Sequence, residues 1–100
     1  MATYIALIQF TDQGIHNIKD TVKRHDAAMA EAKKLGMKIV EPFWTMGAYD
    51  VVVILEAPDD ETMSAFALKI SSLGSVKSHT MRAFRRNEME KFWRKSNSSS

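Results

Sequence analysis

Residues 44–60 read WTMGAYDVVVILEAPDD, and this stretch decides the fold. It contains a turn at Gly47, an apolar run that predicts a strand over 49–56, and the helix-start signal Pro58-Asp59-Asp60. Every residue from 51 to 55 is Val, Ile or Leu, so the strand is apolar on both faces. Such a strand has to be covered on both sides, and we therefore expect it in the centre of a sheet.

Three further strands are predicted around this one. Residues 2–10 are also apolar on both faces, interrupted by Gln9, and predict a second central strand. Residues 37–45 contain Pro42, which cannot donate a ladder hydrogen bond, so this strand should lie at an edge or carry a bulge. Residues 76–85 are more polar and predict the opposite edge.

Two helical segments are predicted before the second strand. Asp12 is expected to cap a short helical turn, and Asp20 or Thr21 is expected to cap a longer helix that ends at Leu35 and Gly36. The apolar stripe expected on this longer helix consists of Val22, Ala28, Met29, Ala32 and Leu35.

Two more helices are predicted in the second half of the chain. One should begin at Asp59 and close at residues 73–74, and its expected apolar stripe consists of Met63, Phe66, Ala67 and Ile70. In the last helix, Asn87 and Glu90 have the spacing of a capping box. Its apolar side consists of Met89, Phe92 and Trp93. We expect that side to dock on the body of the domain or on a neighbouring subunit.

The predicted order is β-α-β-β-α-β followed by a short terminal helix, which is the ferredoxin-like α+β plan with an antiparallel four-stranded sheet. Two right-handed crossovers place strands one and three in the middle and both long helices on one face. One domain is expected over residues 1–95, and the Ser-rich residues 96–100 are expected to be disordered. The other sheet face has apolar residues and no helix. We therefore expect it to pair with a second copy, which gives a homodimer or a higher oligomer.

The composition bounds the class of protein. The 100-residue chain has a net charge of +2, and residues 77–100 carry seven Lys/Arg against two Glu. The absence of cysteine excludes disulfides, thiolate nucleophiles and thiolate metal sites. No apolar run approaches the roughly 18 residues of a membrane span, and the N-terminus lacks the basic leader of a signal peptide. We expect a cytoplasmic protein without membrane contact.

Several separated motifs resemble those of a known family. They are Phe10-Thr-Asp-Gln-Gly14, Ile18-Lys-Asp20, Trp44-Thr45, Gly47-Ala48-Tyr49-Asp50 and Glu56-Ala-Pro-Asp59. Together they make residues 2–92 similar to the GYD-domain family, which is named for a Gly-x-Tyr-Asp signature. The resemblance implies the dimeric α+β barrel architecture. It implies no function, because the family is uncharacterised, and enzymes of this architecture such as antibiotic-biosynthesis-type monooxygenases offer an analogy of fold alone.

The polar groups beside the central strand are the first candidates for a site. Asp50 lies at the mouth of the apolar run, where it could act as a base or ligand anchor together with Tyr49 or His25. The alternative is that Asp50 accepts hydrogen bonds from the Thr11–Gly14 loop or pairs with Lys19, and so fixes the turn.

A ligand site in the same region would use Asp12, Gln13, Lys19 and Trp44. Trp44 could also belong to the core or to an oligomer interface. No metal or other cofactor is predicted, because the histidines (His16, His25 and His79) lack metal-ligand spacing. Nucleic-acid binding is not expected either, because two glutamates interrupt the basic C-terminal set.

These observations favour a small-molecule binding or structural-assembly module without chemistry of its own. The alternative is a cofactor-light enzyme of the monooxygenase or isomerase type that uses Asp50 with Tyr49 or His25. The chain has no Walker loop, dinucleotide fingerprint or serine nucleophile elbow that would indicate another reaction.

Overall fold

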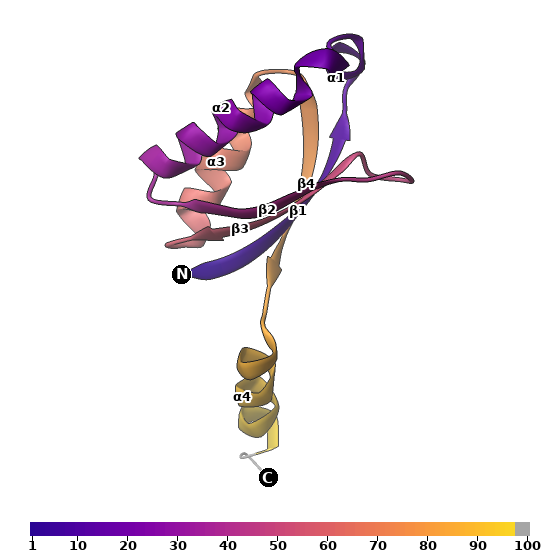
Figure 1. Ribbon diagram of the computed structural model, residues 1–100. Helices are drawn as coiled ribbons and strands as arrows, with labels where there is room; N and C mark the ends of the chain where they lie inside the picture. Colours follow the sequence, from indigo (N-terminus) through magenta and orange to yellow (C-terminus); the bar gives the residue numbers. More distant parts are fainter. Residues whose placement is uncertain (98–100) are drawn as a thin grey trace.

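The computed structural model describes residues 1–97 and shows a two-layer domain from which one helix projects (Figure 1). The elements, in chain order, are β1 (Ala2–Phe10), α1 (Asp12–His16), the 3-10 turn η1 (Ile18–Asp20), α2 (Thr21–Lys34), β2 (Lys38–Trp44), β3 (Val51–Ala57), α3 (Asp60–Ser72), β4 (Val76–Ala83) and α4 (Arg86–Asn97). Within the described residues, no helix is both long enough and apolar enough to span a membrane.

The four strands form one antiparallel sheet in the order β2-β3-β1-β4. The two strands that are apolar on both faces, β1 and β3, are therefore central, as predicted. Helices α2 and α3 cover the same face of the sheet (Figure 1). The predicted ferredoxin-like α+β architecture is confirmed.

The core lies between that face and the two helices. Alternate residues of β1 and β3 point into it, and α3 packs on them through the stripe predicted from its sequence. The buried core residues are Tyr4, Ala6, Ala32, Met37, Val51, Val53, Leu55, Ala57, Met63 and Phe66.

Strand β2 has both features that Pro42 predicts. It is an edge strand, and its register against β3 shifts between Ile39 and Glu41, which leaves Val40 as the extra residue of a bulge. The connection from β2 to β3 turns at Gly47, whose φ of +119° strongly favours glycine.

The apolar stripe predicted for α2 is right for Ala28 and Ala32, which pack on the core, and wrong for its other three residues. Val22 and Met29 are 58% and 45% exposed, Leu35 is exposed as well, and Ala32 is the buried residue of the helix. The side turned toward the sheet is a neighbouring series with the same helical spacing: Thr21, Arg24, His25, Ala28, Glu31 and Ala32. Periodicity indicates that one side of a helix is buried, but it does not decide between two adjacent stripes.

Capping at the helix N-termini follows the prediction at α3 and departs from it at the other helices. The Asp59 carboxylate accepts a hydrogen bond from the Thr62 N–H at 2.7 Å, and this bond lowers the Asp59 pKa. Asp20 precedes α2, but its side chain makes no capping hydrogen bond.

At α4 the predicted capping box is displaced by two residues. The Glu88 carboxylate accepts from the Arg85 N–H at 3.0 Å, so Arg85 and Glu88 hold the places predicted for Asn87 and Glu90. The displacement arises because β4 ends at Ala83, earlier than expected. α4 runs on through residues 96 and 97, and residues 98–100 of the expected tail lie outside the described part.

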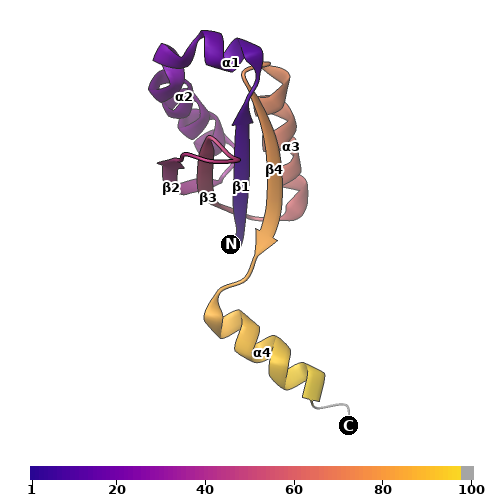
Figure 2. The ribbon, with the colours of Figure 1, turned by 90° about the vertical axis from the view of Figure 1, so that its right-hand side faces the viewer.

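Helix α4 projects beyond the end of β4, away from the sheet and the other helices (Figures 1 and 2). The molecule is accordingly elongated, with extents of 56 × 31 × 19 Å. Phe92 meets the ring of Phe84 at a centroid distance of 5.0 Å, whereas Met89 and Trp93 are 58% and 64% exposed. The apolar side of α4 is therefore not docked on the body, because the linker of residues 84–85 carries the helix past the end of the sheet.

Candidate functional site

The sheet face opposite α2 and α3 carries two apolar rows of side chains. Residues directly opposite each other on antiparallel strands share a face, so the register of the four strands defines each row. From β2 to β4, one row is Phe43, Val52, Leu7 and His79, and the next is Glu41, Ile54, Ile5 and Met81. We call these eight residues the open face.

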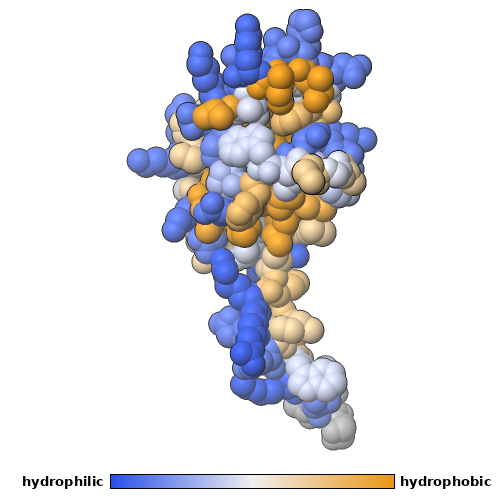
Figure 3. Space-filling model, turned by 45° about the vertical axis from the view of Figure 1, so that its right-hand side comes forward, coloured by the Kyte–Doolittle hydropathy of each residue, from blue (hydrophilic) through white to orange (hydrophobic). Residues whose placement is uncertain are grey.

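The open face is accessible. Phe43 and Met81, at its two sides, are 49% and 47% exposed, and the four central aliphatic residues are half-buried. Figure 2 looks onto this face, with the helices behind the sheet. Hydrophobic side chains gather over the sheet in Figure 3 and are bordered by hydrophilic ones.

A polar cluster lies at one end of the open face. His79 Nε2 and Gln9 Oε1 are 3.2 Å apart, and Gln9 also donates to the Ala48 carbonyl at 3.1 Å. The Tyr49 ring meets the His79 imidazole edge to face, with centroids 5.9 Å apart. The candidate residue Tyr49 therefore belongs to the rim of the open face.

Asp50 connects the start of β3 to the end of β1. Its carboxylate accepts from the Phe10 N–H at 2.8 Å, and its own N–H donates to the Ile8 carbonyl at 2.8 Å. Its carbonyl accepts from the Thr45 N–H at 2.9 Å, which closes the turn between β2 and β3. The carboxylate thus bonds to the backbone of β1 immediately before the Thr11–Gly14 loop.

The loop after β1 packs against the turn between α3 and β4. Thr11 caps α1 in place of Asp12, and its hydroxyl donates to the Gly74 carbonyl at 2.5 Å. The candidate residue Gln13 donates through Nε2 to the Leu73 carbonyl at 3.2 Å. The Gln13 amide therefore already links the loop after β1 to the turn between α3 and β4.

Gly14 makes this packing possible. Its N–H donates to the Thr11 hydroxyl at 3.2 Å, and the residue is buried against Ser75. A Cβ at this position would lie 2.1 Å from the Ser75 carbonyl oxygen, which is too close for any side chain larger than hydrogen.

A cavity of about 270 Å³ lies between the sheet, α2 and α3, and both Trp44 and His25 line it. The Trp44 indole N–H donates to the Thr21 hydroxyl at 3.0 Å. The His25 ring meets the indole edge to face, with centroids 5.7 Å apart. Trp44 lies on the helix side of the sheet because it pairs with the core residue Val51.

The structure separates one of the candidate catalytic residues, His25, from the neighbouring residues Tyr49 and Asp50. Tyr49 lies at the rim of the open face, whereas His25 lies on α2 over the opposite face, so the sheet separates them. Asp12 and Lys19 are exposed, and no ion pair within residues 1–97 joins Lys19 to Asp50. The described part of the chain holds no group of three or more His, Asp or Glu that could bind a metal.

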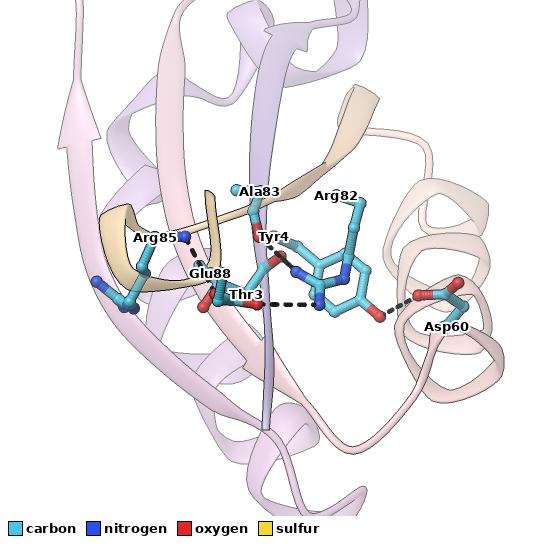
Figure 4. Close-up of polar contacts among 7 residues, drawn as sticks. All are labelled: Thr3, Tyr4, Asp60, Arg82, Ala83, Arg85 and Glu88. Atoms are coloured by element: carbon cyan, nitrogen blue, oxygen red, sulfur yellow. Dashed lines mark hydrogen bonds and ion pairs between the residues drawn. The ribbon is translucent and has the colours of Figure 1, made fainter. Parts of the chain in front are cut away.

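A network centred on Arg82, which the sequence did not predict, lies at the other end of the sheet (Figure 4). The guanidinium donates to the Thr3 carbonyl at 3.0 Å and lies 3.8 Å from the Glu88 carboxylate. It also lies over two rings, 5.5 Å from the Tyr4 centroid and 4.6 Å from that of Phe84. Arg82 therefore joins β1 to the linker and first turn of α4.

Tyr4 extends this network to α3 by donating its hydroxyl to the Asp60 carboxylate (Figure 4). Burial of the phenol, with the Asp60 carboxylate beside it, raises the Tyr4 pKa to about 12. Along the chain, Tyr4 is 56 positions from Asp60 and 78 positions from Arg82. The register between β1 and β4 places Tyr4 opposite Arg82. No local sequence pattern could have shown this.

The GYD domain matches this chain over residues 4–93. The chain belongs to the GYD-domain family. It is similar to a Thermus thermophilus protein named "Glutamine synthetase and cystathionine beta-lyase binding protein", with 32% identity over 84 residues that cover 83% of this chain and 88% of that protein. A crystal structure of a Thermus thermophilus protein aligns with a TM-score of 0.55 and 25% identity, covering 85% of this chain and 95% of that one.

In this GYD domain the signature residues hold the strand connections in place. Gly47 supplies the positive φ of the turn, and Tyr49 packs on His79. Asp50 binds the end of β1 through its side chain and its backbone.

Proposed function

We propose that this GYD-domain protein is a binding and assembly module that works as a homodimer, with the open faces of two copies packed against each other. The observation that carries the proposal is the open face itself: six apolar side chains in two adjacent rows, on the side of the sheet without α2 and α3. Contiguous apolar patches of this kind mark interaction surfaces. Two sheets packed face to face enclose such rows in a shared layer about 10 Å thick.

The distribution of polar groups supports pairing of the face with a copy of itself. Each apolar row ends in a polar residue at one edge strand, Glu41 on β2 and His79 on β4. The centre is aliphatic and the rim is polar, which is the usual anatomy of a protein–protein interface. Strands β1 and β3, apolar on both faces, are then covered on both faces.

Helix α4 forms part of the same proposal. Its exposed Met89, Phe92 and Trp93 are residue types that are enriched in interfaces. Residues 85–97 carry five Lys/Arg against two Glu, whereas residues 1–84 carry nine Lys/Arg against ten Asp/Glu. Because the projecting helix and the body differ in the sign of their net charge, we infer that α4 docks on the second subunit.

Binding of other proteins is supported by one relative. The similar Thermus thermophilus protein is named for binding glutamine synthetase and cystathionine beta-lyase. The proposal takes from it the general class of function, the binding of folded proteins, and not those two enzymes.

The contacts of the candidate catalytic residues also favour binding over chemistry. The Asp50 carboxylate is bonded to the Phe10 backbone N–H, the Tyr49 ring packs on His79, and His25 lies over the other face of the sheet. A base and a second proton-transfer group normally lie within hydrogen-bond reach of one substrate.

The test is the oligomeric state of two variants with a charge on the open face, Leu7→Arg and Met81→Arg. Light scattering coupled to gel filtration should show a dimer for the wild type at micromolar concentration and a folded monomer for both variants. Leu68→Arg, on the exposed side of α3, is the matched control and should remain dimeric. Circular dichroism reports folding, and Met81 lies on an edge strand where a long charged side chain fits without disturbing the core. A folded wild-type monomer, or dimers of both variants, would refute the proposal.

A further inference from the structure

The apolar part of the α2 wall of the cavity between α2, α3 and the sheet is made of small side chains. Ala27 and Ala28 line the cavity from α2, whereas the larger Val22 and Met29 are turned to solvent. Phe66 and Ile70 of α3 form the opposite wall. Protein interiors are normally close-packed, so a mostly apolar space of about 270 Å³ beside the core, partly open to solvent, is a candidate ligand site.

The size and lining of the cavity fit a small apolar body. An apolar cavity of roughly 150 Å³ stays dry and binds benzene, so this one has room for a larger ring or a short branched chain. The floor is the sheet, where Ile8, Val53 and Leu55 present aliphatic side chains. Trp44 forms a wall whose indole N–H is already bonded to Thr21, so the face that it offers is apolar.

The charged side chains around the cavity favour a ligand with a negatively charged polar end. Four titratable side chains line it: Arg24, His25, Glu31 and Lys69. Glu31 lies 3.9 Å from the Lys34 ammonium, which reduces its negative field, whereas no ion pair within residues 1–97 involves Lys69. The cations therefore outweigh the single carboxylate at the rim.

Arg24 is held in position by the fold. Its guanidinium donates to the Asn17 carbonyl at 2.7 Å and to the Gly14 carbonyl at 3.4 Å, and lies 5.9 Å from the centroid of the Phe10 ring. A guanidinium has five N–H donors, so donors remain after these two bonds. The group is a cation held in place at the cavity, while Lys69 is an exposed cation on α3.

We propose that this cavity binds a small amphipathic carboxylate, with its apolar body on Ile8 and Val53 and its carboxylate between Arg24 and Lys69. The ligand is a free small molecule with one ring or a short chain. This inference does not depend on pairing through the open face, because the cavity lies on the other side of the sheet.

The test uses three probes of one shape and different charge: 3-phenylpropionate, 3-phenylpropanol and 3-phenylpropylamine. Trp93→Phe leaves Trp44 as the single tryptophan, so its fluorescence reports binding in the cavity. The carboxylate should bind about tenfold more tightly than the alcohol, the equivalent of one charge-assisted hydrogen bond, and the amine should bind most weakly. Equal affinities for the three probes, or no binding of the carboxylate, would overturn the proposal.

Two variants locate the ligand. Ala28→Leu fills the cavity and should abolish binding of both the acid and the alcohol. Lys69→Gln should weaken binding of the acid several-fold and leave binding of the alcohol unchanged. Lys23→Gln, on α2 but outside the cavity, is the charge-matched control and should change the affinity for neither probe. If Ala28→Leu does not fold, the Lys69→Gln comparison decides alone. Loss of alcohol binding in Lys69→Gln, or an equal loss of acid binding in Lys23→Gln, would refute the assignment.

Discussion

The carboxylate of Asp50 stands in for a backbone carbonyl opposite Phe10, whose N–H it binds at 2.8 Å. The β1–β3 ladder ends at the pair Ile8 and Val51. The next N–H of β1 on the side of β3 is that of Phe10, and it needs an acceptor outside the ladder. Asp50, the residue before β3, supplies it, and its own N–H donates to the Ile8 carbonyl at 2.8 Å. The acid of the Gly-x-Tyr-Asp signature thus serves the joint between the two central strands.

Replacement of Asp50 should therefore affect stability. Asp50→Ala leaves the Phe10 N–H without its acceptor and should lower the free energy of unfolding by about 1–3 kcal/mol. Asp50→Asn keeps one carbonyl oxygen at the same position and should cost less. Urea denaturation at a fixed protein concentration measures both, with Asp12→Ala, at an exposed position, expected to stay within about 0.5 kcal/mol of the wild type. An Asp50→Ala variant as stable as the wild type would contradict this assignment.

Gly14 and Gly36 should respond differently to alanine. A Cβ on Gly14 would lie 2.1 Å from the Ser75 carbonyl oxygen, so Gly14→Ala has to push two loops apart and should cost about 3 kcal/mol. Gly36 has a φ of +72° and open space around it, so Gly36→Ala meets backbone strain alone and should cost about 1 kcal/mol. Chemical denaturation of the two variants compares them directly. The reverse order of stabilities would show that the loop after β1 adjusts without cost.

The sequence predicts the sheet well because the deciding information is local. Residues 51–55 are all aliphatic, which predicts β3 in the centre, while Pro42 predicts that β2 lies at an edge or carries a bulge. The contacts of the site are different in kind. Gly14 meets Ser75 and Tyr4 meets Arg82 only after the chain has folded, and neither pair leaves a periodic pattern.

The cavity shows the same limit on α2. The two adjacent stripes of this helix both have helical spacing, and the sequence favours the one with Val22 and Met29. The structure turns the neighbouring stripe toward the sheet. The two stripes share Ala28 and Ala32, but the one that faces the sheet also carries Arg24. The helix is thus rotated about its axis from the predicted orientation. Large apolar side chains that were expected over the sheet point to solvent instead, and a cavity remains beside the core.

Tyr4 should make stability depend on alkaline pH. Its pKa is about 12 in the folded protein and about 10 when unfolded, so the unfolded chain loses the phenolic proton first. The contribution is present in full below pH 10 and is lost as pH rises from 10 toward 12. Tyr4→Phe lacks this term, so its denaturation midpoint should fall less steeply over that range, although it should be lower at pH 7 by the loss of the bond to Asp60.

Tyr49→Phe is the matched control for this experiment. Tyr49 is only half-buried, and the ring contact with His79 that the structure shows does not require its hydroxyl. The variant keeps Tyr4 and its bond to Asp60, so it should keep the loss of stability that Tyr4 causes between pH 10 and 12. Parallel curves for the wild type and Tyr4→Phe would show that the proton of Tyr4 does not contribute.

Trp93 provides a direct view of where α4 lies in solution. In a single subunit it is 64% exposed, and the proposed docking of α4 on a second subunit would cover it. In a Trp44→Phe background, Trp93 is the single tryptophan, and its fluorescence reports α4 alone. Acrylamide should quench it less in the dimer than in a monomer produced by Met81→Arg, because the dimer shields the indole from collisions. Equal quenching in the two states would place α4 in solvent and leave the open face as the whole of the dimer contact.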